Sequence, residues 1–477
     1  MNWQTVIGLE VHAQLKTCSK LFSSTATTYG SPANSQTSYI DAGLPGVLPV
    51  LNQSAVQMAV QFGLAIGAEI NHLSFFERKN YFYPDLPKGY QISQLQRPIV
   101  SNGQLEISTD DNMIKKIIIE RAHLEEDAGK SLHEAHPTYT GIDLNRAGTP
   151  LLEIVTTPCL YSASEAISYL KSLHQLLRFL DICDGNMQEG SFRCDVNISL
   201  KPVDSKQLGT RTELKNLNSF RFIEKAISFE QQRHQDLLEN GQLITQETRL
   251  YCPNTDTTQL LRSKENENDY RYFPDPDLLP IQITAKDIEY IKDCMPALPS
   301  AIRQRLEKED NLTIIDIDFL LTSPALVHFF EDVKRQSHAD AKTIINWLKG
   351  TYSAALKEKG LTFEQPPVAA TQLACLLDRL TDNIIPVTLA KTIFGQLMTG
   401  AQHIDELITK SGYQQQDDTQ LIEEIIRTTI TNYPQQAADY RAGKDKLLGF
   451  FVGQVMKQTK GQADPAQVNT LLIKHLA

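Results

Sequence analysis

Near the start of this 477-residue chain, residues 6–15 read Val6-Ile7-Gly8-Leu9-Glu10-Val11-His12-Ala13-Gln14-Leu15, and the expected fold is built around them. Its apolar residues alternate with polar or small ones, a period of two that is typical of a strand with one buried face. The other face carries Glu10 and His12 two residues apart. We therefore expect a half-buried strand that presents a carboxylate and an imidazole side by side.

Two more strands with polar faces are expected further along the chain. Lys116 to Glu126 starts as an apolar strand and ends beside a run of acids, and the stretch 193–200 alternates, with Asp195 on its polar face. Amphipathic helices are expected over 162–183, opened by a capping box of Ser162 and Glu165, and over 219–240, ended by Gly241. Because helices do not follow every strand, this order favours an α+β fold with an antiparallel or mixed sheet.

The strand pattern fades after a Pro-rich stretch that begins at Phe273 and recurs up to Pro299. We expect an α+β catalytic domain over 1–293, a helical domain over 294–403 and a helical tail domain over 404–477.

Residues 440–477 carry a net charge of +4, whereas the whole chain carries −11. The tail helix 447–457 places Gly449 and Gly453 on one face, which fits either close approach of a partner backbone or helix packing inside the domain.

Composition limits the class of protein. Apolar residues make up 41% and charged residues 22%, as in ordinary globular proteins. The sequence has no apolar stretch of about 18 residues, the length that predicts a membrane span. Its start lacks a basic segment followed by an apolar one, and its seven cysteines are dispersed without a CxxC pair. We therefore expect a cytoplasmic protein without disulfides.

The sequence lacks the common catalytic motifs, including GxGxxG, HExxH, GxSxG and a Ser-rich amidase loop. What remains is a high density of acids on or beside strand faces. Oxygen-rich sites with one imidazole suit Mg²⁺, although solvated sheet faces with ordinary ion pairs remain the alternative.

The run Asn80 to Gln94 interleaves aromatic residues with Lys and Gln, so it could stack a nucleobase or form a rigid loop over a sheet edge.

Several motifs together resemble those of one family, the B subunit of the bacterial glutamyl/aspartyl-tRNA amidotransferase. They are Ile7 to His12, Lys79 to Gln94, His123 to Lys130, Asp143 to Glu153, Glu189 to Asp195, Glu213 to Phe220, Tyr270 to Pro274, and the tail stretch Gly449 to Lys457 with Gly461, Pro465 and Asn469. The resemblance runs from residue 3 to the end of the chain.

The resemblance implies a function. Such subunits bind tRNA(Gln) misacylated with glutamate or tRNA(Asn) misacylated with aspartate. They use ATP and Mg²⁺ to phosphorylate the side-chain carboxylate, and ammonia then displaces the phosphate. An A subunit makes the ammonia from glutamine and a small C subunit completes a heterotrimer. The family architecture is a cradle-like α+β domain, a helical domain and a basic helical tail that binds tRNA.

Carried onto this chain, the resemblance implies three overlapping sets of residues. The metal would be held, directly or through water, by Glu10, His12, Glu126, Glu189 and Glu213. The catalytic set would be Glu10, His12, Glu125, Glu126 and Glu213, with Glu125 and Asp195 as indirect ligands. Phosphate charge would be offset by Lys79, Arg193, Lys215 and Arg271.

The chain departs from the family at one place. Many members carry two cysteine pairs that bind zinc, near the positions filled here by Ser23, Ser24, Ser38 and Asp41. A thiolate site cannot form without those cysteines, so we expect no zinc.

The alternative to the enzymatic interpretation is a non-catalytic, tRNA-binding scaffold. Clustering of Glu10, His12 and Glu126 around one volume would favour the enzyme.

Overall fold

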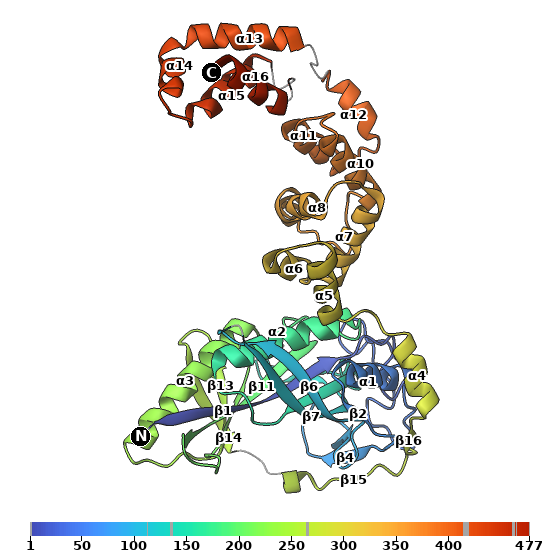
Figure 1. Cartoon of the computed structure of the whole chain (residues 1–477). Coiled ribbons are helices and arrows are strands. Elements are labelled where there is room, and N and C mark those ends of the chain that lie inside the picture. The colour runs from blue at the N-terminus through green and yellow to red at the C-terminus, as the bar shows by residue number, and fades with distance from the viewer. Residues whose placement is uncertain are drawn as a thin grey trace. The chain divides into compact units, whose positions relative to one another are not determined.

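The computed structural model describes residues 2–111, 113–133, 137–263, 267–413, 419–459, 463 and 465–476. The chain divides into two compact units, Met1–Ile302 and Arg303–Ala477. All described strands lie in the first unit, and the described elements of the second are helices (Figure 1). The α+β class with a helical C-terminal region is thus confirmed. The division at 293 and 403 stays a prediction.

A nine-stranded sheet forms the centre of the first unit, and β1 (Trp3–Gln14) is its middle strand. Its strands run in the order β14 (Thr257–Ser263), β13 (Glu247–Cys252), β12 (Thr212–Lys215), β11 (Phe192–Pro202), β1, β10 (Pro150–Thr156), β7 (Ile114–Glu126), β6 (Val100–Ser108) and β2 (Glu69–Ile70). The described neighbours pair antiparallel, except that β12 and β13 are parallel. The sheet is therefore mixed, as the sequence predicts.

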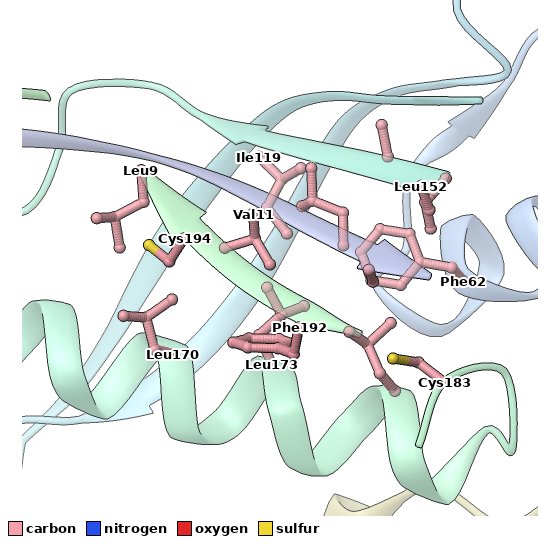
Figure 2. Packing of buried hydrophobic residues seen from close by; sticks show 14 of the residues in the cluster. Leu9, Val11, Phe62, Ile119, Leu152, Leu170, Leu173, Cys183, Phe192 and Cys194 are labelled. Atoms are coloured by element: carbon pink, nitrogen blue, oxygen red, sulfur yellow. The ribbon is translucent and has the colours of Figure 1, made fainter. Parts of the chain in front are cut away.

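The two faces of β1 separate the core from the polar side of the sheet. Ile7, Leu9, Val11 and Ala13 are buried, whereas Gly8, Glu10, His12 and Gln14 are only half-buried. Figure 2 shows Leu9 and Val11 on the side of β1 that faces helix α2. The core on this side is completed by α1 (Gln53–Ala65), α2 (Ala163–Phe179) and α3 (Phe220–Glu239). Helices thus cover one face of the sheet near its centre and leave Glu10 and His12 on the other.

Two of these helices test the expected helix ends. The Ser162 hydroxyl caps α2 by accepting from the Glu165 amide, but the Glu165 carboxylate accepts from Tyr161 and does not close the expected box on Ser162. The predicted end at Cys183 is wrong. The helix stops at Phe179, because Asp181 takes a left-handed φ of 55° that turns the chain. Ser219 caps α3, and Gly241 follows it with a φ of 70°, as expected.

Short strands and one helix complete the first unit. Small sheets are formed by β15 (Phe273–Pro274) with β4 (Glu77–Asn80) and β5 (Tyr90–Ser93), by β16 (Ile281–Gln282) with β3 (Leu73–Ser74), and by β8 (Lys130–Leu132) with β9 (Gly141–Asp143). The 3-10 turn Glu267–Tyr270 precedes β15, and α4 (Ala285–Asp293) follows β16. The Pro-rich run from Phe273 therefore pairs back onto the first unit.

The second unit consists of helices in its described part. They are the end of α5 (Pro299–Glu309), α6 (Ile314–Leu320), α7 (Pro324–Gln336), α8 (Ala341–Trp347), a π-helical turn (Leu348–Tyr352), α9 (Ser353–Lys359), α10 (Ala370–Thr381), α11 (Val387–Leu397), α12 (Ile404–Lys410), α13 (Thr419–Asn432), α14 (Pro434–Arg441), α15 (Leu447–Gln458) and α16 (Pro465–Leu476). The last four share an apolar cluster that includes Ile426, Phe451 and Leu472. No described helix is long and apolar enough to cross a membrane.

The glycine face of α15 is open. Gly449 and Gly453 are exposed, and a Cβ atom added at either would meet no described atom within 4 Å. Packing inside the tail therefore does not account for these glycines among the described residues. Lys460 and Gly461, which follow this helix in the sequence, lie outside the described residues.

Candidate functional site

The polar face of the nine-stranded sheet carries a cavity of about 840 Å³. Strands β1, β7, β10, β11 and β12 supply its floor, and the segments around Lys79, Tyr270 and Tyr272 also contribute to its lining. Among the lining side chains are Glu10, His12, His123, Glu153, Asp195 and Glu213. A polar cavity over the middle strand of the sheet is thus the candidate site.

Strand register brings the functional side chains together. His12 lies opposite Glu153 on β10, and Glu153 lies opposite His123 on β7. Along the opposite edge of β1, Glu10 pairs with Asp195 on β11. Asn197 follows Asp195 by two residues on β11 and pairs with Glu213 on β12. Because alternate residues share a face, these pairings converge on one surface from five adjacent strands.

One group, which we term the histidine cluster, consists of His12, Glu125 and Glu153. Their nearest ligand atoms all lie within 4.8 Å of one another. The His12 Nε2 atom is 3.3 Å from Glu153 Oε2 and 3.8 Å from Glu125 Oε1. Glu153 also lies 3.5 Å from His123 Nε2. Two carboxylates and two imidazoles therefore meet at the junction of β1, β10 and β7.

The charged groups of the histidine cluster shift one another's pKa values. Burial alone would lower the pKa of His12, but the carboxylates of Glu153 and Glu125 outweigh burial and raise it to about 9. Burial would raise the pKa of Glu153, whereas His123 and His12 hold it well below its usual range. A positive charge is thus favoured between the two carboxylates, and a proton on His12 supplies it here.

The second group, the carboxylate cluster, consists of Glu10, Asp195 and Glu213, and its ligand atoms also lie within 4.8 Å of one another. Asn197 Nδ2 donates to Glu10 at 2.9 Å. Lys215 Nζ donates to Asp195 at 2.5 Å and lies 3.4 Å from Glu213. Burial would lower the pKa of Lys215, but Asp195 and Glu213 raise it. Three carboxylates with one lysine leave a net negative site.

The donor sets of both clusters fit Mg²⁺. Hard divalent cations prefer carboxylate oxygens and tolerate an imidazole, and the carboxylate cluster offers oxygen donors from three different strands. Repulsion among three carboxylates at such short range is relieved when a cation lies between them. The residues that would hold it are Glu10, Asp195 and Glu213 in one cluster, and His12, Glu125 and Glu153 in the other.

The four predicted phosphate-binding cations divide into two pairs. Lys79 and Lys215 line the cavity. The Lys79 ammonium lies 5.0 Å from the centre of the Tyr270 ring and makes no hydrogen bond or ion pair with a residue that the structure describes. Arg193 instead donates to Asp127 at 3.0 Å, and Arg271 is exposed with a φ of 47°. Neither arginine lines the cavity.

Burial alone would lower the pKa of Lys79, but the carboxylates of Glu125 and Glu153 help to raise it. The Lys79 side chain therefore carries a positive charge beside the histidine cluster.

Two predicted ligands lie apart from both clusters. The Glu126 carboxylate accepts from the Lys88 ammonium and from the Ile92 amide at 2.9 Å. Glu189 is exposed in the turn before β11. Neither residue lines the cavity. Of the three residues chosen to distinguish an enzyme from a scaffold, Glu10 and His12 therefore share the cavity and Glu126 does not.

Sequence reasoning missed Glu153 and His123 as site residues. Glu153 is an isolated acid inside the otherwise apolar, buried strand β10, and a lone acid in such a strand is the signal that could have found it. His123 precedes Glu125 by two residues, so the period of two already places both on one face. Their meeting with His12 depends on strand register, which one sequence does not contain.

The aromatic run around Lys79 is partly buried and partly open. Tyr81 packs edge-to-face on Tyr270 and on Tyr83, with ring centres 6.0 and 6.1 Å apart. Tyr270 and Tyr272 line the cavity, whereas the Phe82 side chain is 80% exposed. The run thus helps to hold one wall of the cavity beside Lys79.

An ion pair occupies the segment where the family resemblance leads one to expect cysteine pairs in many members. Lys20 is fully buried, and its ammonium donates to Asp41 at 2.8 Å and to the Gln36 carbonyl at 2.6 Å. Asp41 also accepts from the Ser38 amide at 2.8 Å. Hydroxyls and a carboxylate already paired with lysine do not fit a zinc site.

Comparisons with known proteins agree with this geometry. Residues 5–289 match the family model described as "GatB/GatE catalytic domain", and residues 328–476 match the "GatB domain". The chain is 64% identical over 476 residues to the B subunit of the aspartyl/glutamyl-tRNA(Asn/Gln) amidotransferase from Legionella pneumophila. It is 54% identical to the protein of that name from Thioalkalivibrio sulfidiphilus and 53% identical to that from Coxiella burnetii.

Each of these alignments covers 100% of both chains. The strands that carry the two clusters lie within the region matched by the catalytic-domain model. By full-length similarity, the chain belongs to the family of tRNA-dependent amidotransferase B subunits.

Proposed function

We propose that the cavity phosphorylates the side-chain carboxylate of Glu-tRNA(Gln), Asp-tRNA(Asn) or both, with ATP as donor, and then converts the product to the amide. The observation that carries the proposal is that the two clusters meet at one cavity. Glu10, His12, Glu153, Asp195 and Glu213 line that cavity, together with Lys79. Phosphoryl transfer needs cations around the γ-phosphate and a fixed position for the attacking oxygen.

The chemistry explains why a phosphate is required. A carboxylate is a poor electrophile because ammonia would have to expel oxide. In the proposed reaction a carboxylate oxygen attacks the γ-phosphorus, the bond to the β-phosphate oxygen breaks and ADP leaves. Ammonia then attacks the carbonyl carbon, phosphate departs and the amide nitrogen loses a proton. When bound, Mg²⁺ would neutralise the negative charge on the transferring phosphoryl group.

The chain's own residues would orient the reactants. Lys79 is positively charged at the wall of the cavity and suits an anionic carboxylate or phosphate. Lys215 and Asn197 hold Asp195 and Glu10 in place by hydrogen bonds. Tyr270 and Tyr272 add aromatic side chains to the lining of the same cavity.

We further propose that the chain works in a heterotrimer with an A subunit, which releases ammonia from glutamine, and a small C subunit. The sequence lacks a Ser-rich amidase loop, and the relatives are named as one subunit of an enzyme. From Leu21 to Ala68 the only charged residue is Asp41, which is buried on Lys20.

In the same stretch the side chains of Tyr39, Leu48 and Val50 are 74%, 64% and 71% exposed. An exposed surface without charge suits a protein partner. Copurification of the three subunits tests the assembly.

Trapping of the acyl phosphate tests the proposed reaction. The complete complex is incubated with ATP, Mg²⁺ and each mischarged tRNA in turn, with hydroxylamine in place of glutamine. We expect a hydroxamate on the amino-acid side chain, formed together with ADP, for at least one of the two tRNAs. A complex that forms no hydroxamate would contradict the proposed reaction. Hydroxamate formation that is unchanged in a complex carrying Glu10→Gln would favour the scaffold interpretation of this chain.

A further inference from the structure

A buried polar network lies behind the carboxylate cluster, on the opposite face of the sheet. The inner face of α3 is apolar at Ile223 and Ile227, but the next residues on that face are Glu230 and His234. All four are fully buried. Charged and polar groups thus replace the apolar stripe where α3 covers β12, β13 and β14, although burying them costs more than burying leucine or isoleucine.

The network holds β12 directly. Thr212 is fully buried, and its hydroxyl is 2.9 Å from His234 Nε2 and 3.4 Å from the Arg233 guanidinium. Thr212 immediately precedes Glu213, so the two side chains point to opposite faces of the same strand. Hydrogen bonds from α3 to the back of β12 therefore fix the backbone from which Glu213 reaches into the cavity.

The network also holds the neighbour of β12. Glu230 accepts from Arg233 at 2.8 Å and lies 3.2 Å from Arg249 on β13. Arg249 in turn donates to Glu247 at 2.8 Å. Glu247 and Arg249 flank Thr248, which lies opposite Glu213 and donates to its carboxylate at 2.7 Å.

Glu213 and its hydrogen-bond partner Thr248 are thus each adjacent in sequence to residues that the network holds. Strand β12 has only four residues, of which three pair with β11 and all four pair with β13. Apolar contacts would allow such a short strand to shift, whereas hydrogen bonds are directional and define one position.

We propose that the network of Thr212, Glu230, Arg233, His234 and Arg249 positions Glu213 for cation binding in the carboxylate cluster. These are positioning residues, because none of them lines the cavity with its side chain. The inference rests on the proposed function, since it takes the carboxylate cluster as a cation site. Partners that orient a metal ligand commonly change metal affinity by about 10–100-fold when removed.

The test is a titration of the full chain with Mn²⁺ alone, followed by electron paramagnetic resonance, which counts sites and measures affinity. Thr212→Val removes the hydroxyl at nearly constant shape, and Thr212→Ser retains it. We expect the native chain to bind two ions. In Thr212→Val the affinity of one site should fall about 10–100-fold and the other should not change, and Thr212→Ser should keep both sites.

A second pair of variants addresses the same hydrogen bond from the helix. His234→Leu should weaken the same site, whereas His234→Gln, which keeps a nitrogen donor, should weaken it less. Ile227→Val is the matched control, because it trims α3 on the same face without touching a polar contact. It should leave both affinities unchanged even where it lowers the unfolding temperature.

Three results would contradict the account, and they are distinguishable. Equal affinities in Thr212→Val and Thr212→Ser would overturn the positioning role and leave the proposed function standing. Loss of both sites in parallel with the unfolding temperature, in Ile227→Val as well, would show a purely structural network. A native chain that binds no Mn²⁺ would overturn the proposed cation sites and this inference with them.

Discussion

Glu10 and His12 occupy successive positions on the polar face of β1, yet each belongs to a different cluster. The sequence pattern was sufficient to predict that they share a face, and the family resemblance added Glu213, Lys79 and Lys215. The resemblance also placed Glu126 in the site. Glu126 follows Glu125 directly in β7, so the two side chains point to opposite faces of the sheet. The pairing of His12 with Glu153 could not be predicted, because register between strands distant in sequence is set by the whole sheet.

Substitution of Glu10 tests the carboxylate cluster at the residue scale. Glu10→Gln should lower ATP-dependent activation about 100-fold or more, because loss of a carboxylate reduces charge stabilisation in the transition state. Glutamine hydrolysis by the partner A subunit should be at least partly retained. The measurement is tRNA-dependent ADP release by the complex, with the exposed Glu106→Gln as control.

Near-normal ADP release in Glu10→Gln would contradict the assignment of Glu10. Glu126→Gln should cost less than Glu10→Gln, since the Glu126 carboxylate is bound to Lys88 and Ile92 outside the clusters.

The buried pair of Lys20 and Asp41 leads to a second prediction. The purified chain should contain no stoichiometric zinc, because Asp41 is already paired with an ammonium. Lys20→Met should lower the free energy of unfolding by about 3–5 kcal/mol, as expected when one partner of a buried pair is removed. Elemental analysis and thermal unfolding are the measurements. One zinc ion per chain, or full stabilisation of the variant by added zinc, would refute this account of the loop.

At the scale of elements, periodicity predicted three central strands of the first unit, β1, β7 and β11, and two of its helices, including α3 with its cap at Ser219 and its stop at Gly241. It failed at the end of α2, where Asp181 takes a left-handed φ, which Asp adopts more readily than most residues other than glycine. The polar half of the buried face of α3 was also not predicted. A single helix pattern does not show that Glu230 meets arginines from both α3 and β13.

The buried carboxyl group of Glu230 predicts a pH dependence of stability. Burial would raise its pKa, but hydrogen bonds from His234 and Arg233 lower it from 4.5 to about 2. A carboxyl group with a lower pKa in the folded than in the unfolded chain stabilises the fold above pH 4.5, and this contribution is lost as the pH falls from 4.5 towards 2.

Glu230→Gln should therefore unfold at a lower temperature at pH 7 and lose part of the native protein's sensitivity to acid. Thermal unfolding of both proteins at pH 7 and at about pH 3 is the measurement. Glu224→Gln, the same substitution at an exposed position of α3, is the control. Parallel pH profiles for native protein and Glu230→Gln would argue against the ionised carboxylate.

At the scale of the whole molecule, the tail has an apolar cluster of its own, and the first unit has another. A chain that ends after residue 403 should therefore keep the fold of the first unit and its contacts with the A subunit. It should bind tRNA more weakly, because it lacks residues 440–477, whose net positive charge would attract the RNA phosphates. Equal tRNA affinity of the full-length and shortened complexes at two salt concentrations would leave the tail without this role.

The open face of α15 makes this expectation more specific. Lys446 and Lys457 are exposed on either side of Gly449 and Gly453. Replacing both lysines by alanine should reduce the salt dependence of tRNA binding by roughly one unit of slope for each lost phosphate contact. Lys391→Ala, an exposed lysine on α11, is the matched control.

Phosphorylation of the side-chain carboxylate is tested most directly by following an oxygen atom from the amino-acid side chain into inorganic phosphate. The complete complex is given ATP, Mg²⁺, glutamine and mischarged tRNA whose side-chain carboxylate carries ¹⁸O at both oxygens, and the inorganic phosphate is analysed by mass spectrometry. Because the attacking carboxylate oxygen becomes the bridge to phosphorus and leaves with it, each phosphate released with amide should contain one ¹⁸O atom. Amide formation accompanied only by unlabelled phosphate would contradict phosphorylation of the carboxylate in this cavity.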